Sequence, residues 1–139
     1  MYRKVFLIFV FTFLLSACAG TSQSATEITL GATDFAYSPA SVTVPVGKSI
    51  TLTIKNDGKV EHDFVIQKIN VIDVVKQEDG MNMGHDMSSM EYDLHTSTQP
   101  GESNVITFTP TEAGTYEFFC TVEGHKEAGM IGELVVVEQ

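Results

Sequence analysis

Near its C-terminus the chain reads Phe118-Phe119-Cys120-Thr121-Val122-Glu123-Gly124-His125-Lys126-Glu127-Ala128-Gly129-Met130. This Cys-x4-His-x4-Met pattern places a thiolate, an imidazole and a thioether on one short loop between two apolar strands. Cys and Met are soft ligands, and together with His they suit copper better than magnesium or calcium. A trigonal copper site takes two His, one Cys and a weak axial Met, so a second His must come from elsewhere.

His62 is the candidate for the missing ligand. It follows the turn Asn56-Asp57-Gly58 and opens a β-strand pattern far upstream of Cys120. A site with one ligand from an early strand and three from a late loop would be held by the fold itself. Such rigid support suits electron transfer, because a fixed ligand set changes little between two oxidation states. The alternative is that His62 is an ordinary surface or core histidine.

From residue 27 onward the chain has the pattern of short β-strands. Hydrophobic residues alternate with polar ones in several runs, and turn-forming Asn, Asp, Gly and Pro separate these runs. The runs lie at 28–30, 42–46, 50–54, 64–66, 105–108, 116–120 and 132–137. This pattern predicts an all-β fold, an antiparallel β-sandwich. A domain of roughly 110 residues buries a sufficient core without disulfides.

The first 17 residues have the pattern of an export signal. Two basic residues precede an apolar run at 5–15, which is too short to span a bilayer because a spanning helix needs about 20 residues. Leu15-Ser16-Ala17-Cys18 resembles the lipobox of bacterial lipoproteins, whose cysteine is lipidated and becomes the mature N-terminus. The alternative is a secretory signal that discards Cys18. We expect a signal peptide at 1–17, lipidated Cys18 with a tether at 18–26, and an exported domain at 27–139.

The net charge of the chain limits the kinds of molecule that it can bind. The chain has 8 basic and 18 acidic residues, a net charge of −10, which repels nucleic acid and anionic lipid head groups. An acidic surface either steers a basic redox partner or serves solubility alone.

After Cys18, Cys120 is the single cysteine, so the expected domain forms no internal disulfide. A lone thiol in an oxidising compartment needs protection, which burial or metal ligation would provide.

These features together resemble the cupredoxins, the blue-copper proteins that include plastocyanin, azurin and auracyanin. The resemblance covers residues 27–137 apart from a methionine-rich insertion. It rests on Phe35 and Pro39, on Asn56-x-Gly58 before His62-Asp63-Phe64, on Gly114-x-Tyr116-x-Phe118-x-Cys120, and on the Cys120/His125/Met130 loop. The four-residue gaps on either side of His125 are most similar to those of the auracyanin and rusticyanin group.

The resemblance implies a Greek-key β-sandwich, the cupredoxin fold, with one type 1 copper. His62, Cys120 and His125 would be the equatorial ligands, and Met130 the axial ligand. His125 would lie at the exposed edge of its loop, where the electron leaves. Azurin and plastocyanin have Asn after the first His, whereas this chain has Asp63, whose carboxylate should favour Cu(II) and lower the redox potential.

The same comparison argues against an enzyme. Multicopper oxidases and nitrite reductases have His beside the ligating Cys, but the neighbours here are Phe119 and Thr121. A dinuclear electron-transfer site needs a second Cys on the loop, which the domain lacks. We therefore expect a monomeric electron carrier that exchanges single electrons with redox proteins. Its lipid would anchor it to a membrane of the cell envelope, on the periplasmic side or the outer face.

A Met/His-rich insertion at 76–95 interrupts the β pattern. Met83, Met87 and Met90 would share one face of a helical turn, because they lie at i, i+4 and i+7. They either pack on the sandwich as adaptable filler or contribute to a second, weaker Cu(I) site. That site would draw on Met81, Met83, His85, Met87 and Met90, with His95 as a further candidate. With such a site, the protein would be a copper carrier or storage protein.

Overall fold

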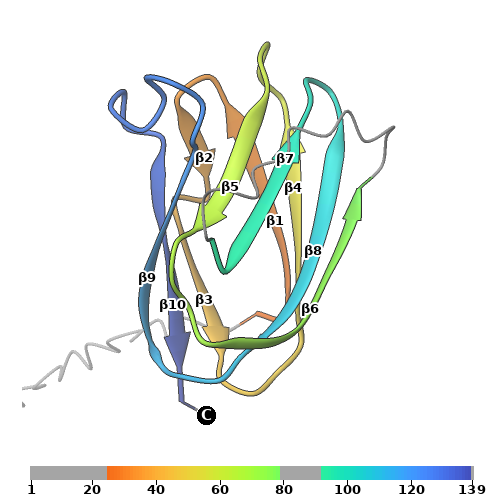
Figure 1. Cartoon of the computed structure of the whole chain (residues 1–139), viewed down its shortest axis with the longest axis vertical. Helices are drawn as coiled ribbons and strands as arrows, with labels where there is room; N and C mark the ends of the chain where they lie inside the picture. The colour runs from red at the N-terminus through yellow and green to blue at the C-terminus, as the bar shows by residue number, and fades with distance from the viewer. Residues whose placement is uncertain (1–24, 79–91, 139) are drawn as a thin grey trace, which may run out of the picture.

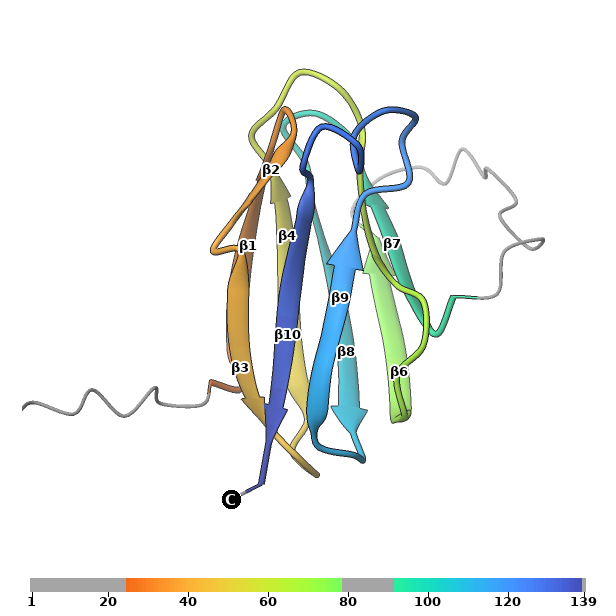
Figure 2. The ribbon, with the colours of Figure 1, turned by 90° about the vertical axis from the view of Figure 1, so that its left-hand side faces the viewer.

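Within the described residues, 25–78 and 92–138, the computed structural model contains ten strands in two sheets that face each other (Figures 1 and 2). The first sheet has the strand order β2-β1-β4-β8-β6, and the second has the order β3-β10-β9-β5-β7. The strands are β1 (Glu27–Thr33), β2 (Ala36–Ser38), β3 (Ser41–Pro45), β4 (Ile50–Asn56), β5 (His62–Ile66), β6 (Val71–Glu78), β7 (Leu94–Thr98), β8 (Ser103–Pro110), β9 (Gly114–Phe119) and β10 (Ile131–Val137). No helix in these ranges is long and apolar enough to cross a membrane.

The predicted all-β sandwich is confirmed, but its strand pairing is mixed rather than purely antiparallel. β1 pairs with β4 in parallel, and β3 pairs with β10 in parallel. Parallel neighbours need a crossover connection. Between β1 and β4 the chain crosses to the second sheet to form β3, so β4 returns to the first sheet in the same direction as β1. The other strand pairs are antiparallel.

The core lies between the sheets and follows the alternation seen in the sequence. On β4, Ile50, Leu52 and Ile54 are buried, while the residues between them are less buried. Fully buried Phe64, Phe108 and Phe118 come from three different strands, one of them in the first sheet and two in the second. Burying such a side chain contributes about 1.5–3 kcal/mol, so these alternating faces drive the two sheets together.

The insertion region contains a strand that the hydrophobic pattern does not reveal. β6 forms an edge of the first sheet and pairs with β8. Asp73 has a positive φ of 55°, and the pairing shifts register between Ile72 and Val75. A bulge of this kind breaks the two-residue alternation. The expected insertion at 76–95 therefore begins inside β6 and ends inside β7, while Met81, Met83, His85, Met87 and Met90, like Cys18, lie outside the described residues.

Gly132 lies in β10 where its neighbours leave no room for a side chain. A Cβ atom there would lie 2.2 Å from Phe118 Cζ and 2.7 Å from the Ala40 carbonyl oxygen. Because Phe118 is fully buried, its ring has no room to move away. We expect Gly132→Ala to lower the free energy of unfolding by about 3 kcal/mol, measured by urea denaturation.

Gly31→Ala is the matched control for this substitution. Gly31 also lies in a strand, but a Cβ there would approach nothing closer than the Ser38 carbonyl oxygen at 3.5 Å. Its effect should stay within about 0.5 kcal/mol, which is usual for a substitution without a clash. Equal losses of stability in the two variants would contradict the proposed contact.

Candidate metal centre

The four predicted ligands lie at or beside strand ends at one end of the sandwich, where the loops before β5 and before β10 meet (Figure 1). His62 is the first residue of β5, and Cys120 follows the last residue of β9. His125 lies in the β9–β10 loop, and Met130 directly precedes β10. All four side chains are buried, with His125 the most exposed at 6%. The sandwich therefore holds ligands from distant parts of the sequence.

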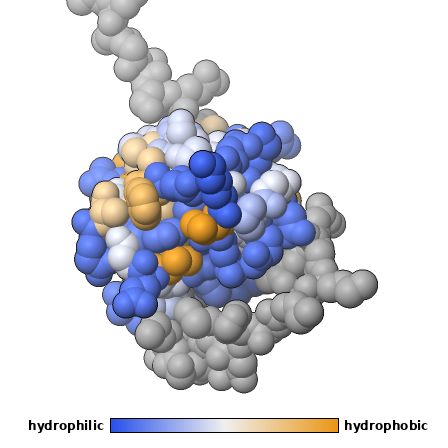
Figure 3. Space-filling view, turned by 90° about the horizontal axis from the view of Figure 1, so that it is seen from above, coloured by the Kyte–Doolittle hydropathy of each residue, from blue (hydrophilic) through white to orange (hydrophobic). Residues whose placement is uncertain are grey.

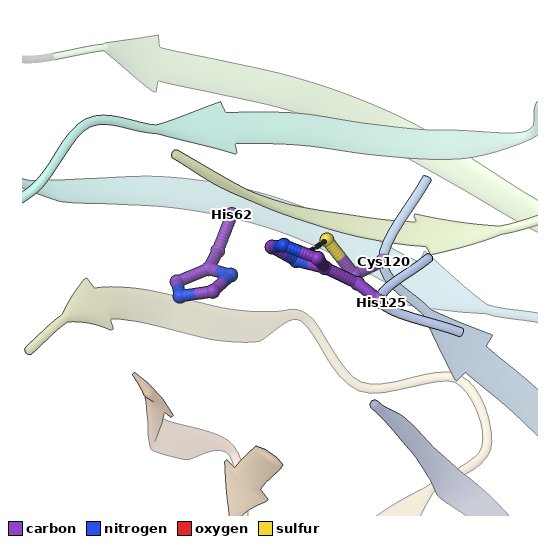
Figure 4. A group of neighbouring side chains, drawn as sticks. All are labelled: His62, Cys120 and His125. Carbon is purple, nitrogen blue, oxygen red and sulfur yellow. Dashed lines mark hydrogen bonds between the residues drawn. The ribbon is translucent and has the colours of Figure 1, made fainter. Parts of the chain in front are cut away.

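Three of the four ligand side chains converge. The ligating atoms of His62, Cys120 and His125 all lie within 4.8 Å of one another. Cys120 Sγ is 3.4 Å from Nδ1 of His125, and Figure 4 shows this pair facing the His62 ring. Among the described residues, no other group of three His, Cys, Asp or Glu side chains meets in this way. The predicted metal-binding triplet is thus assembled in space.

Backbone hydrogen bonds fix Met130 to the same loop. The Met130 N–H donates to the His125 carbonyl oxygen at 3.0 Å, and the Cys120 N–H donates to the Met130 carbonyl oxygen at 3.3 Å. Gly129, just before Met130, has a φ of 105°, a conformation that favours glycine. The Met130 side chain is fully buried, so its thioether lies inside the same end of the fold.

The buried position of the Cys120 thiol disfavours its negatively charged form unless a cation is nearby. Burial raises the pKa of this thiol, while backbone N–H groups of Asp63 and Val122 partly oppose the rise. The Asp63 N–H donates to Sγ at 3.4 Å. A thiolate, the form that binds metal, is costly in such a buried site unless a positive ion accompanies it. The thiol environment therefore fits a metal ligand.

His62 has a ring nitrogen that no other group uses. Both Nδ1 and Nε2 are buried without a hydrogen-bond partner among the described residues. Burial lowers the pKa of His62 first, and the nearby His125 lowers it further. Nε2 faces Asp34 Oδ1 at 3.5 Å, which leaves Nδ1 for a metal. A neutral imidazole with an unpaired buried nitrogen is the state that a metal ion completes.

His125 is more enclosed than the sequence predicts. The expectation that it lies at the exposed edge of its loop is wrong, because only 6% of the residue is exposed. The ring of Phe35, in the β1–β2 turn, covers it edge to face with centroids 5.1 Å apart. Phe35 has a φ of 71° and is 50% exposed. The aromatic ring, rather than the imidazole, therefore meets solvent.

Asp63 joins the two ligand-bearing segments. Its carboxylate accepts a hydrogen bond from the Thr121 hydroxyl, and its Oδ1 lies 3.9 Å from Nε2 of His95. Burial alone would raise the pKa of this carboxyl, but the nearby His95 and the hydrogen bond from Thr121 outweigh it and hold the pKa below its ordinary value. Asp63 is therefore a buried, negatively charged residue beside two ligands.

Four residues of this region carry roles that the sequence did not assign. Asp34 faces His62, Phe35 covers His125, Thr121 binds Asp63, and the Tyr37 hydroxyl donates to the Asp63 carbonyl oxygen. Thr121 could have been found from its place next to Cys120. The other three lie in or next to the β1–β2 turn, which carries no metal-ligand pattern of its own.

Comparison with known proteins agrees with this site. Residues 24–137 match the family described as copper binding proteins, plastocyanin/azurin family. The chain is 34% identical over 100 residues to the copper-resistant cuproprotein CopI of Rubrivivax gelatinosus, covering 72% of this chain and 59% of that protein. It is 36% identical over 115 residues to plastocyanin of Sambucus nigra, covering 79% of this chain and 98% of that protein.

A solved structure also shares the fold. The dithionite-reduced auracyanin of Roseiflexus castenholzii superposes with a TM-score of 0.63 at 29% identity, covering 83% of this chain and 99% of that one. These relatives are cupredoxins that are not enzymes, in agreement with the prediction for this chain. The donor set of His62, Cys120, His125 and Met130 is thus a type 1 copper site.

Proposed function

The chain belongs to the plastocyanin/azurin family of copper-binding proteins, and on that premise we propose that it shuttles single electrons between redox proteins at the cell envelope. The observation that carries this proposal is the burial and convergence of His62, Cys120 and His125. When bound there, copper supplies a one-electron Cu(II)/Cu(I) couple. The backbone hydrogen bonds of the ligand loop hold the donors in place, so a change of oxidation state requires little rearrangement.

The face over His125 is the proposed route for the electron. Phe35 and Val60 are exposed apolar side chains from the two loops at this end. Figure 3, which views the molecule from this end, shows a few hydrophobic residues within a mostly hydrophilic surface. A small apolar contact surrounded by polar groups suits a weak, short-lived redox complex. The net charge of −10 supports a basic partner.

The orientation of β1 determines at which end of the sandwich the proposed anchor would attach. β1 runs parallel to β4, which ends at Asn56 in the copper-bearing end, so Glu27 begins at the opposite end (Figure 1). A lipid on Cys18 would therefore connect to the end of the sandwich that lies away from copper. The ligand-bearing face would point away from the membrane, toward an exported partner. We expect the mature protein to act there as a monomer.

An electron shuttle and a copper carrier differ in whether copper stays bound while the protein exchanges electrons. The copper of a shuttle should be reduced and reoxidised repeatedly by a redox partner or a small-molecule mediator while it stays bound to the protein. We expect the copper content after repeated cycles, measured by elemental analysis after desalting, to stay near one per chain. Transfer of the metal to a Cu(I) chelator within the first cycles would contradict the shuttle.

A second candidate function is copper handling, and similarity to a copper-resistant cuproprotein favours it. In this proposal Met81, Met83, His85, Met87 and Met90 bind a second, weaker Cu(I). Titration of the protein with Cu(I) should then give two equivalents, and deletion of residues 81–90 should reduce this to one. A single equivalent in both proteins would exclude the second site.

A further inference from the structure

Asp34 lies in the β1–β2 turn, against Nε2 of His62, the ring nitrogen that would face away from a bound metal. Its Oδ1 is 3.5 Å from Nε2. The His62 side chain is fully buried, whereas that of Asp34 is 39% exposed. Among the described residues, no hydrogen-bond partner serves Nε2, so Asp34 is the polar group placed to receive its proton. The carboxylate thus reaches a buried ligand from the surface.

The loop before β5 holds this carboxylate in place. The Lys59 N–H donates to Asp34 Oδ1 at 3.1 Å, and this hydrogen bond is the main reason that the pKa of Asp34 is lowered. Gly58 lies directly against the contact, since a Cβ there would be 2.6 Å from His62 Nε2 and 2.7 Å from Asp34 Oδ1. The absence of a side chain at residue 58 leaves the space in which the two groups meet.

We propose that Asp34 is a positioning residue of the copper site, which accepts the Nε2–H of His62 and thereby presents Nδ1 to copper. A carboxylate on the outer nitrogen fixes the tautomer of a metal-bound histidine and raises its basicity. Its negative charge also stabilises Cu(II) more than Cu(I), because Cu(II) carries one more positive charge. Asp34 therefore lowers the redox potential. The inference rests on the copper site and holds whether the protein carries electrons or copper ions.

Asp34→Asn tests the charge, because asparagine keeps an oxygen of similar shape and loses only the negative charge. We expect it to shift the Cu(I)/Cu(II) equilibrium about tenfold toward Cu(I), which raises the midpoint potential by about 59 mV. Asp57→Asn is the matched control. Asp57 lies in the loop before β5, and its substitution removes the same charge. Its carboxylate, however, pairs with Lys55 at 2.7 Å instead of facing His62.

Competition with a chelator then identifies the oxidation state affected. Asp34→Asn should weaken Cu(II) binding about tenfold and leave Cu(I) binding nearly unchanged, whereas Asp57→Asn should change both by less than about twofold. Asp34→Ala, which also removes the acceptor oxygen, should weaken Cu(II) binding further than Asp34→Asn. Equal midpoints in Asp34→Asn and Asp57→Asn would overturn the assignment. So would a midpoint shift that arises from Cu(I) binding alone.

Discussion

Replacing Cys120 by serine should abolish the intense visible absorption of the Cu(II)-loaded protein. That absorption comes from transfer of charge from a thiolate to copper, and Cys120 is the only cysteine in the domain. A serine hydroxyl does not ionise near neutral pH and is a harder donor than sulfur, so it cannot replace the thiolate. Copper affinity should fall by more than the roughly 10–100-fold that loss of a supporting residue causes. The measurements are the visible spectrum and a chelator competition.

Two features make this result specific to the metal site. Serine is close to cysteine in size, so a folded Cys120→Ser variant is expected, and circular dichroism would verify it. Met130→Leu, which removes only the weak axial donor, should keep an intense band at a changed wavelength and potential. Loss of the band in Cys120→Ser with retention in Met130→Leu identifies the thiolate as its source. A copper-loaded wild-type protein without such a band would refute the type 1 site.

The ligands could be predicted from the sequence because their residue types and their spacing identify them. Cys120, His125 and Met130 lie on one loop, so no knowledge of the fold is needed to bring them together. His62 could be added because it begins a strand with a buried pattern, and the structure confirms its convergence with the loop. The sandwich followed from alternation of hydrophobic residues, as on β4 and β8, where the faces are cleanly divided.

The surroundings of the ligands could not be predicted in the same way. Asp34 and Asp57 are both aspartates in turns, where aspartate is common for local reasons. Asp34 reaches His62 because β1 pairs in parallel with β4, which places the turn after β1 beside the loop before β5, whereas Asp57 pairs with Lys55. Phe35 covers His125 because the backbone turns through a φ of 71°. The β6 strand was hidden for a related reason, since the bulge at Asp73 breaks the alternation on which recognition of a strand depends.

Asp63→Asn should raise the midpoint potential more than Asp34→Asn does. Asp63 is 7% exposed, and its carboxylate accepts a hydrogen bond from Thr121, the neighbour of Cys120, so its charge would lie close to bound copper and be poorly screened by water. At a separation on the order of 7 Å and an effective dielectric constant of about 20, one unit charge contributes about 2 kcal/mol. That corresponds to a roughly 30-fold shift toward Cu(I), or about 90 mV, measured by redox titration.

The sign follows from which oxidation state the carboxylate stabilises. Cu(II) gains more from a nearby negative charge than Cu(I), so removing the charge makes reduction easier and the potential rises. Asparagine retains an oxygen that accepts the Thr121 hydroxyl, and the Asp63 N–H to Cys120 belongs to the backbone, so both links between the segments survive. The substitution therefore changes the charge while it preserves the geometry.

Thr121→Val and Asp93→Asn separate the effect of the Asp63 charge from the effect of its hydrogen bond to Thr121. Thr121→Val removes the hydrogen bond but keeps the charge, and it should move the midpoint much less than Asp63→Asn does. Asp93→Asn removes a charge that is paired with Lys68 at 3.6 Å, and it should have little effect. A midpoint that falls or stays constant in Asp63→Asn would mean that the carboxylate exerts no net charge on copper. Asp63 would then act only as the clamp between β5 and the Cys120 loop, a role that asparagine fulfils equally well.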